Sequence, residues 1–330
     1  MAETITSSVK PARVRVHPFL RQSGVFWVLV LLCLTAAFIS PYFLQYNNII
    51  NVIRQISIVG VISIGMTFVI LTSGIDLSVG SIVGLVAVIV ASILAAGGSP
   101  RLAVPAGLLL GTVLGALNGL GIAFGRIPPF IMTLGSMVGL RGLAMIYANG
   151  SPVSWESTHT DFSWLGTGSV LRVPVSVWLF IAVFLVAGFV LRYTSFGRHI
   201  YAIGDSREAA RLSGINVRRV EIGAYTIMGF LSALAAVLFV SRLDVGEPTA
   251  GTGAELDAIA MVVIGGTSTF GGEGGVKGTL VGAAIIAVLA NLLNLLGISP
   301  FIQQLVKGVI IVFAVLIERQ RQRRGTAKSA

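Results

Sequence analysis

The sequence contains few charged residues. Only 11% of its 330 residues are Asp, Glu, Lys or Arg, whereas 55% are hydrophobic. A water-soluble domain carries about 25% charged residues, so this chain has too little polar surface to cover a globule in water. Lipid solvates apolar side chains directly, and several stretches approach the roughly 20 apolar residues that a membrane-spanning helix needs. The composition therefore predicts an integral membrane protein.

Cysteine is almost missing, and this excludes a disulfide framework. The single cysteine, Cys33, lies inside the first apolar run. Glycine, by contrast, is abundant, and the 40 glycines lie largely inside apolar runs. Small residues in such runs let helix backbones approach closely in lipid, so the glycines indicate packed membrane helices.

Motifs for catalysis and cofactor binding are also missing. The run 271–279 contains glycines, a lysine and a threonine, but Gly278 separates Lys277 from Thr279. A phosphate-binding loop needs Gly, Lys and Ser or Thr in direct succession after a strand. Neither a zinc-ligand spacing nor a Gly-x-Ser-x-Gly motif is present. We therefore expect that the chain is not itself an enzyme and holds no cofactor or metal.

Ten apolar segments are expected to form membrane helices. The eighth is short and interrupted by glycine, so we expect a broken or partly inserted helix there. The segments run roughly over residues 24–40, 55–72, 79–97, 102–124, 129–148, 174–191, 220–241, 257–270, 278–296 and 301–317.

The basic residues behind the net charge of +10 cluster in three places: the tail 1–23, the loop 192–219 and the tail 318–330. Lys and Arg beside spans mark the cytoplasmic side of a membrane. With the N-terminus inside, ten crossings place the other two clusters inside as well. This agreement predicts a membrane domain over 24–317 with both termini cytoplasmic, and it favours contact with a lipid bilayer over nucleic-acid binding.

Ionisable residues inside the apolar segments are few. The candidates are Asp76 beside a break, Arg141 in the fifth segment, and Glu255 and Asp257 at one edge of the eighth. A carrier driven by protons or sodium usually needs such groups within the membrane. Because no chain of carboxylates runs through the segments, we expect the driving energy to enter from outside this chain.

The inside loop 192–219 carries the most specific pattern. Asp205 or Ser206 can cap a short helix, Glu208 suits its first turn, and Gly214 can end it in a left-handed conformation. The loop can be a capped connecting helix alone or a charged docking element on the cytoplasmic face.

Four motifs carry a resemblance to a known family. The run 208–210, Glu-Ala-Ala, is followed after three residues by Gly214 and resembles the EAA signature of bacterial ABC importer permeases. Segments 73–81, 127–135 and 255–268 resemble the ribose, xylose and galactose type of sugar permease. The resemblance extends from about residue 50 to 317. One departure is Ser73, where the family more often has glycine.

The resemblance implies an all-α polytopic permease of the ABC importer fold, similar to the vitamin B12 importer, in the bacterial inner membrane. Glu208, Ala209, Ala210, Gly214 and Ile215 would form a coupling loop that docks into a cleft on a cytoplasmic ATPase subunit, often a tandem fusion. A second permease copy or a paralogue would complete the membrane channel. A periplasmic sugar-binding protein would dock on the outer face, and the cargo would be a small monosaccharide, a pentose or hexose.

A pathway for sugar needs polar and aromatic side chains that project from apolar helices. The candidates chosen on this ground can equally form hydrogen bonds between helices. Asp76 can be a gate, although a helix cap or a structural ion pair is favoured. The pathway candidates are Asn118, Phe130, Thr133, Ser136, Asn291, Asn294 and Gln304.

Two alternative functions remain open from the sequence. One is a secondary carrier driven by an ion gradient, with Asp76 and Asp257 as ion ligands. The other is a membrane scaffold that moves no solute and whose inside loop binds a soluble partner. The EAA-like loop favours the importer over the carrier, and the lack of a recognisable extramembrane domain counts against the scaffold.

Overall fold

The computed structural model describes residues 18–155 and 160–327, and over these ranges the fold is helical. Each of the ten predicted segments contains a helix. Three short helices and four two-residue strands lie between them. The ten longer elements are α1 (Pro18–Ile39), α2 (Tyr46–Leu71), α3 (Val79–Ala95), α4 (Pro100–Ala123), α5 (Pro129–Tyr147), α7 (Val175–Tyr193), α10 (Val217–Leu243), α11 (Ala254–Ile264), α12 (Val276–Leu295) and α13 (Pro300–Ala327).

Six of these helices are each long and apolar enough to cross a membrane alone: α2, α4, α5, α7, α10 and α12. The apolar part of α1 and the whole of α3 are shorter. The eighth predicted segment forms α11, which has 11 residues and ends at Ile264, after which a glycine-rich loop follows. At 1.5 Å per residue such a helix covers about half of a 30 Å hydrocarbon layer.

Helices α1 and α13 extend beyond the predicted membrane domain, since α1 begins at Pro18 and α13 continues to Ala327. Hydropathy marks where apolar residues stop, whereas a helix continues into water for as long as its backbone bonds are favourable. Most of the predicted N-terminal tail, including Lys10, Arg13 and Arg15, lies outside the described residues.

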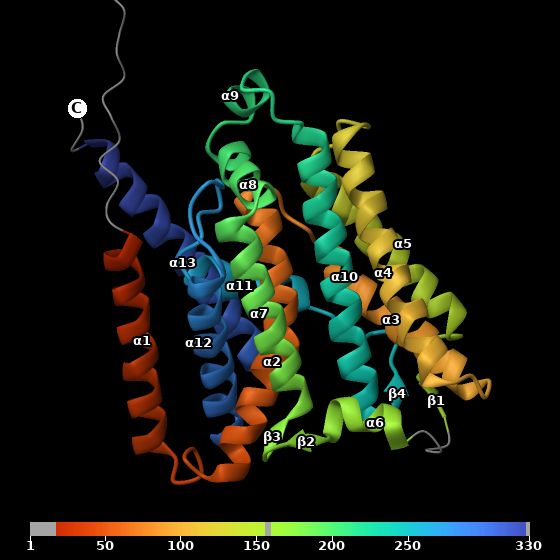
Figure 1. Ribbon diagram of the computed structural model, residues 1–330. Coiled ribbons are helices and arrows are strands. Elements are labelled where there is room, and N and C mark those ends of the chain that lie inside the picture. The colour runs from red at the N-terminus through yellow and green to blue at the C-terminus, as the bar shows by residue number, and fades with distance from the viewer. Residues whose placement is uncertain (1–17, 156–159, 328–330) are drawn as a thin grey trace, which may run out of the picture.

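Extramembrane elements gather at the two ends of the helix bundle (Figure 1). The short helices α8 (Ser195–Asp205) and α9 (Arg207–Leu212) lie at one end, where α13 also finishes. At the opposite end lie α6 (Thr160–Thr167) and two antiparallel pairs, β1 (Val153–Ser154) with β4 (Val245–Gly246) and β2 (Ser169–Val170) with β3 (Val173–Pro174). The loop 192–219 and the C-terminal end of α13 thus lie at the same end of the bundle.

The core lies where α2, α3, α4 and α10 meet. Val61, Ile82, Tyr225 and Val237 are buried there. Helices α4 and α10 approach each other closely at glycines: a Cβ on Gly115 would lie only 2.8 Å from the Gly229 Cα. This contact confirms the role in close packing that the glycine content predicts.

Candidate functional site

Helices α8 and α9 are each held by a side-chain cap. The Gly197 amide donates to Thr194 Oγ1 at 3.2 Å at the start of α8, and the Ala209 amide donates to Ser206 Oγ at 3.3 Å at the start of α9. Gly214 follows α9 with φ +83°, and the Ile215 amide returns to the Ala210 carbonyl at 3.1 Å. The capped helix predicted over this loop is confirmed, with Ser206 as the cap.

The outward face of α9 is charged, with one large apolar side chain. Glu208 accepts hydrogen bonds from Arg211 Nε at 3.1 Å and Arg211 Nη2 at 2.5 Å, and these bonds lower the pKa of Glu208. Leu212 is 74% exposed, Ala209 is exposed, and Ala210 is buried against the rest of the protein. A large exposed leucine between charges at the tip of a rigid helix is suited to a protein contact.

An ion pair fixes α9 to α10. Both Nη atoms of Arg207 donate to the carboxylate of Glu221, with Nη2 and Oε2 3.0 Å apart. Glu221 is only 3% exposed, whereas the Arg207 side chain is half exposed. Because a buried carboxylate needs its partner, α9 cannot tilt freely away from the N-terminal part of α10.

The last turn of α8 contacts two interrupted regions of the chain. Gly204 lies against the Leu71 carbonyl at the end of α2 and against Gly271 and Gly272 in the loop after α11. The Gly272 amide donates to the Leu71 carbonyl at 3.0 Å. Tyr201 Oη donates to the Gly274 carbonyl at 2.9 Å. Helix α8 therefore contacts both glycine-rich breaks at once.

Ser73 lies in the same contact, and its side chain makes a bond there that the glycine more common in the family could not make. Its φ is +64°, a left-handed conformation that favours glycine. Its Oγ donates to the Phe270 carbonyl at 2.6 Å, a bond that glycine cannot make. The serine thus ties the α2–α3 break to the 265–275 loop.

Beyond Ser73, the α2–α3 break enters a buried polar network. Asp76 Oδ1 accepts bonds from the Ser78 amide at 2.8 Å and Ser78 Oγ at 2.6 Å. Asn118 Nδ2 of α4 donates to Ser78 Oγ at 2.8 Å, and Ser136 Oγ of α5 donates to Asn118 Oδ1 at 2.5 Å. Asp76 Oδ2 has no partner among the described residues. The network connects α3, α4 and α5 at one point.

The Ile75 carbonyl in this break is held from two sides. Thr133 Oγ1 of α5 lies 3.3 Å from it, and Tyr225 Oη of α10 donates to it at 3.2 Å. Three predicted pathway residues, Asn118, Thr133 and Ser136, therefore lie close together around the break. Asn118 and Thr133 are buried in the conformation seen here.

The other pathway candidates lie elsewhere. Phe130 is 53% exposed on α5, and Gln304 is exposed on α13. Asn291 and Asn294 lie near the far end of α12, away from α9. The glutamine that contacts Asn294 is Gln303, whose Nε2 donates to Asn294 Oδ1 at 2.7 Å.

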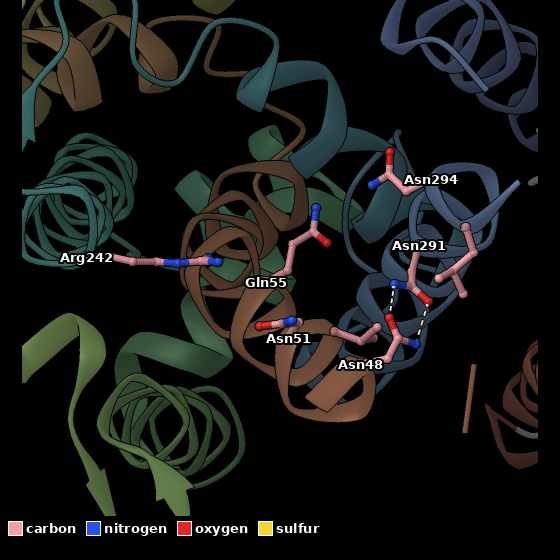
Figure 2. A pocket seen from close by; sticks show the side chains of 8 residues that line it. Asn48, Asn51, Gln55, Arg242, Asn291 and Asn294 are labelled. Carbon is pink, nitrogen blue, oxygen red and sulfur yellow. Dashed lines mark hydrogen bonds between the residues drawn. The ribbon is translucent and has the colours of Figure 1, made fainter. Parts of the chain in front are cut away.

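A polar pocket of about 480 Å³ surrounds Asn291 and Asn294. Figure 2 shows Gln55 of α2 between the tip of Arg242 and the two asparagines of α12. The residues that line the pocket are Asn48, Asn51, Val52, Gln55, Arg242, Asn291, Asn294 and Leu295.

Sequence reasoning missed the α2 side of this pocket. Asn48, Asn51 and Gln55 recur at i, i+3 and i+7, a spacing that places them on one helix face. Asn48 and Asn51 lie before the predicted segment 55–72, and Gln55 is its first residue, because hydropathy alone sets where that segment begins.

Asp257, an ion ligand in the alternative carrier, is already paired with a cationic side chain. Lys307 Nζ of α13 lies 2.9 Å from Asp257 Oδ2. Arg141 Nη1 donates to the carbonyls of Pro248 at 2.5 Å and Ala250 at 3.0 Å, just before α11. These bonds join α5 and α13 to the segment around α11.

Comparison with known proteins gives matches over most of the chain. A family model described as branched-chain amino acid transport system / permease component matches residues 48–315. The ribose import permease protein RbsC of Escherichia coli (strain K12) is 47% identical over 92% of this chain and 95% of its own. The L-arabinose ABC transporter permease protein AraH of Azospirillum brasilense is 36% identical, over 96% of this chain and 94% of its own. The xylose transport system permease protein XylH of Escherichia coli (strain K12) is 36% identical, over 86% and 87%. No solved structure matches.

Proposed function

This chain belongs to the branched-chain amino acid transport system / permease component family, and we propose that it is the membrane-spanning permease of an ATP-driven importer for a monosaccharide. The similar relatives are named for ribose, arabinose and xylose, so a pentose is the first cargo to test. The observation that carries the proposal is the capped helix α9, which stands at one end of the bundle and is tied through α8 to the interior.

Helix α9 is the surface that docks on a cytoplasmic ATPase. Glu208 and Ala209 face outward beside Leu212, and Gly214 with Ile215 closes the helix so that this face is held at a fixed angle. Ala210 is buried and anchors the helix from beneath. The bidentate pair between Arg207 and Glu221 makes α9 and α10 move together, so a push on α9 reaches the membrane helices.

Movement of α9 is transmitted through the contact of α8 with the two breaks. Gly204 contacts both Leu71 and Gly272, and Ser73 bonds the two breaks to each other. A shift of α8 therefore changes the position of the α2–α3 break and of the Asp76 network beneath it. Hinged segments that connect packed helices are the usual means by which domain motion opens and closes a site. In this proposal Asp76 holds the break together, and Asn118, Thr133 and Ser136 line the inner part of the pathway when it opens.

The finer architecture follows the same proposal. The chain crosses the cytoplasmic membrane of a bacterium ten times, with the fold of the vitamin B12 importer and both termini inside. It pairs with a second copy or a paralogue, and Phe130 and Gln304 are exposed on the helices available for that contact. A binding protein delivers sugar at the end that carries α6 and the strand pairs, and the ATPase, alone or as a tandem fusion, binds α9.

The test is reconstitution of the chain with the ATPase and binding protein encoded beside it. Wild type is compared with Glu208→Lys and Gly214→Pro for ATPase co-purification and for uptake of labelled ribose, arabinose, xylose and a hexose. We expect both variants to remain folded, to lose the ATPase and to lose uptake. Retention of the ATPase by both variants would show that α9 is not the docking surface.

A further inference from the structure

The polar pocket at the far end from α9 is built mainly from carboxamides (Figure 2). Asn48 and Asn291 bond each other through two Nδ2 to Oδ1 bonds of 3.0 and 2.7 Å, which fixes the position of both side chains. Asn294 is held by a single bond, which Gln303 Nε2 donates to Asn294 Oδ1 at 2.7 Å. One wall of the pocket is therefore rigid before any ligand arrives.

The opposite wall presents polar groups that have no hydrogen bond to other described residues. Asn51, Gln55 and Arg242 line the pocket, and their side chains form no bond within the parts of the chain that the structure describes. Arg54, next to Gln55, has a buried Nε without a partner in that same set. Asn51, Gln55 and Arg242 are therefore available for a ligand that supplies acceptor oxygens.

The chemistry of the lining distinguishes a polyol from an anion. Each free carboxamide offers donors and an acceptor, and a hydroxyl group both donates and accepts. An ionised carboxylate accepts only, so it would leave the oxygens of Asn51 and Gln55 without donors, and a phosphate ion near neutral pH has only one or two hydroxyls to donate. Val52 and Leu295 add an apolar surface for the C–H face of a ring. The volume of about 480 Å³ lies within the range of about 300–1,000 Å³ usual for small-molecule sites.

We propose that this pocket is an outer binding site for a neutral polyhydroxylated solute, a monosaccharide with vicinal hydroxyls. Arg242 donates to a pair of hydroxyl oxygens, while Asn51 and Gln55 bond the remaining ones. The inference rests on the proposed function, because it takes the outer end of the bundle as the side of sugar entry. It adds a site whose α2 and α10 residues lie apart from the inner network around Asp76.

Uptake kinetics give the first test. In the reconstituted importer, Gln55→Leu is compared with Gln45→Leu, an exposed glutamine at the start of the same helix that does not line the pocket. Loss of hydrogen bonds to a bound sugar is expected to raise the KM for uptake about tenfold for Gln55→Leu, with the control unchanged. If Gln55→Leu has an unchanged KM while wild type transports sugar, the pocket is not a sugar-binding site, and the proposed function still stands.

Cysteine labelling gives a second test that needs no transport. Because Cys33 is the only cysteine in the sequence, Cys33→Ser provides a background without cysteine. Gln55→Cys and Gln45→Cys in that background are treated with a membrane-impermeant thiol reagent in proteoliposomes, with the pentose, sodium phosphate or no addition. We expect the pentose to slow labelling at residue 55 severalfold and to leave residue 45 unaffected. Protection by phosphate rather than pentose, or no protection at residue 55, would overturn the assignment.

Discussion

Gly204 is the residue at which the cytoplasmic helix α8 meets both breaks, and alanine there tests whether this contact transmits force. A Cβ on residue 204 would meet the Leu71 carbonyl oxygen and the Gly272 amide nitrogen, and would lie 3.0 Å from the Gly271 carbonyl carbon. All three are backbone atoms, which cannot rotate away as a side chain does. Gly204→Ala must therefore open the contact between α8 and the breaks.

The magnitude follows from two opposing effects. Overpacking costs about 1–3 kcal/mol, and the backbone partners place this site in the upper part of that range. Alanine recovers up to about 1 kcal/mol of helix propensity in α8. The net penalty of about 1–2 kcal/mol corresponds to a factor of about 5–30 in the population of the closed contact. We expect sugar uptake per ATP hydrolysed to fall by a factor in this range.

The assay measures initial uptake and ATP hydrolysis in the same proteoliposomes, together with co-purification of the ATPase. Since α9 is untouched, the ATPase should remain bound and only its coupling to uptake should fall. Gly24→Ala is the matched control, because a Cβ on residue 24 of α1 meets nothing within 4 Å. If Gly204→Ala transports as much sugar per ATP as wild type and this control do, α8 does not transmit the movement.

Three further substitutions test the contacts around this route. Arg207→Ala leaves Glu221 buried without its cation, and we expect the free energy of unfolding to fall by about 2–3 kcal/mol. The loss is below the full value for a buried pair because Arg207 is half exposed. Thermal melts in detergent should show recovery of stability when Glu221→Gln is added, and no recovery would contradict the pairing. Ser73→Gly relieves a left-handed conformation worth about 1–2 kcal/mol but loses a bond to Phe270 worth about 1 kcal/mol. Its melting temperature should therefore stay within a few degrees of wild type while coupling weakens, and a large fall in melting temperature would refute this balance. Asn118→Leu removes the bonds to the buried Ser78 and the half-buried Ser136, each worth about 1 kcal/mol, so it should melt earlier than the exposed control Asn47→Leu. Equal melting would argue against the network.

Local sequence signals predicted the parts of the structure that depend on neighbours in the chain. Apolar runs gave a helix in each of the ten segments, because burial in lipid and backbone bonding are both satisfied within one helix. The cap at Ser206 and the left-handed Gly214 were predictable for the same reason, since capping involves residues only a few positions apart.

Contacts between distant segments could not be predicted in this way. The pair of Arg207 with Glu221 depends on how the loop folds back on α10, and the choice of Gln303 over Gln304 as partner of Asn294 depends on the rotation of α13. The amino-acid composition determines neither how the loop folds back nor how α13 is rotated. The polar pocket combines residues of α2, α10 and α12, so the polar face of α2 that carries Asn48, Asn51 and Gln55 supplies only part of its lining.

The central claim is that ATP, acting through α9, drives sugar uptake by this chain, and a single comparison of driving forces tests it most directly. Proteoliposomes that contain the chain, its ATPase and its binding protein are loaded with ATP in the absence of any ion gradient, or given proton and sodium gradients without ATP. We predict accumulation of labelled pentose with ATP alone, abolished by Glu208→Lys. Accumulation that follows the ion gradient, is indifferent to ATP and survives Glu208→Lys would contradict the account.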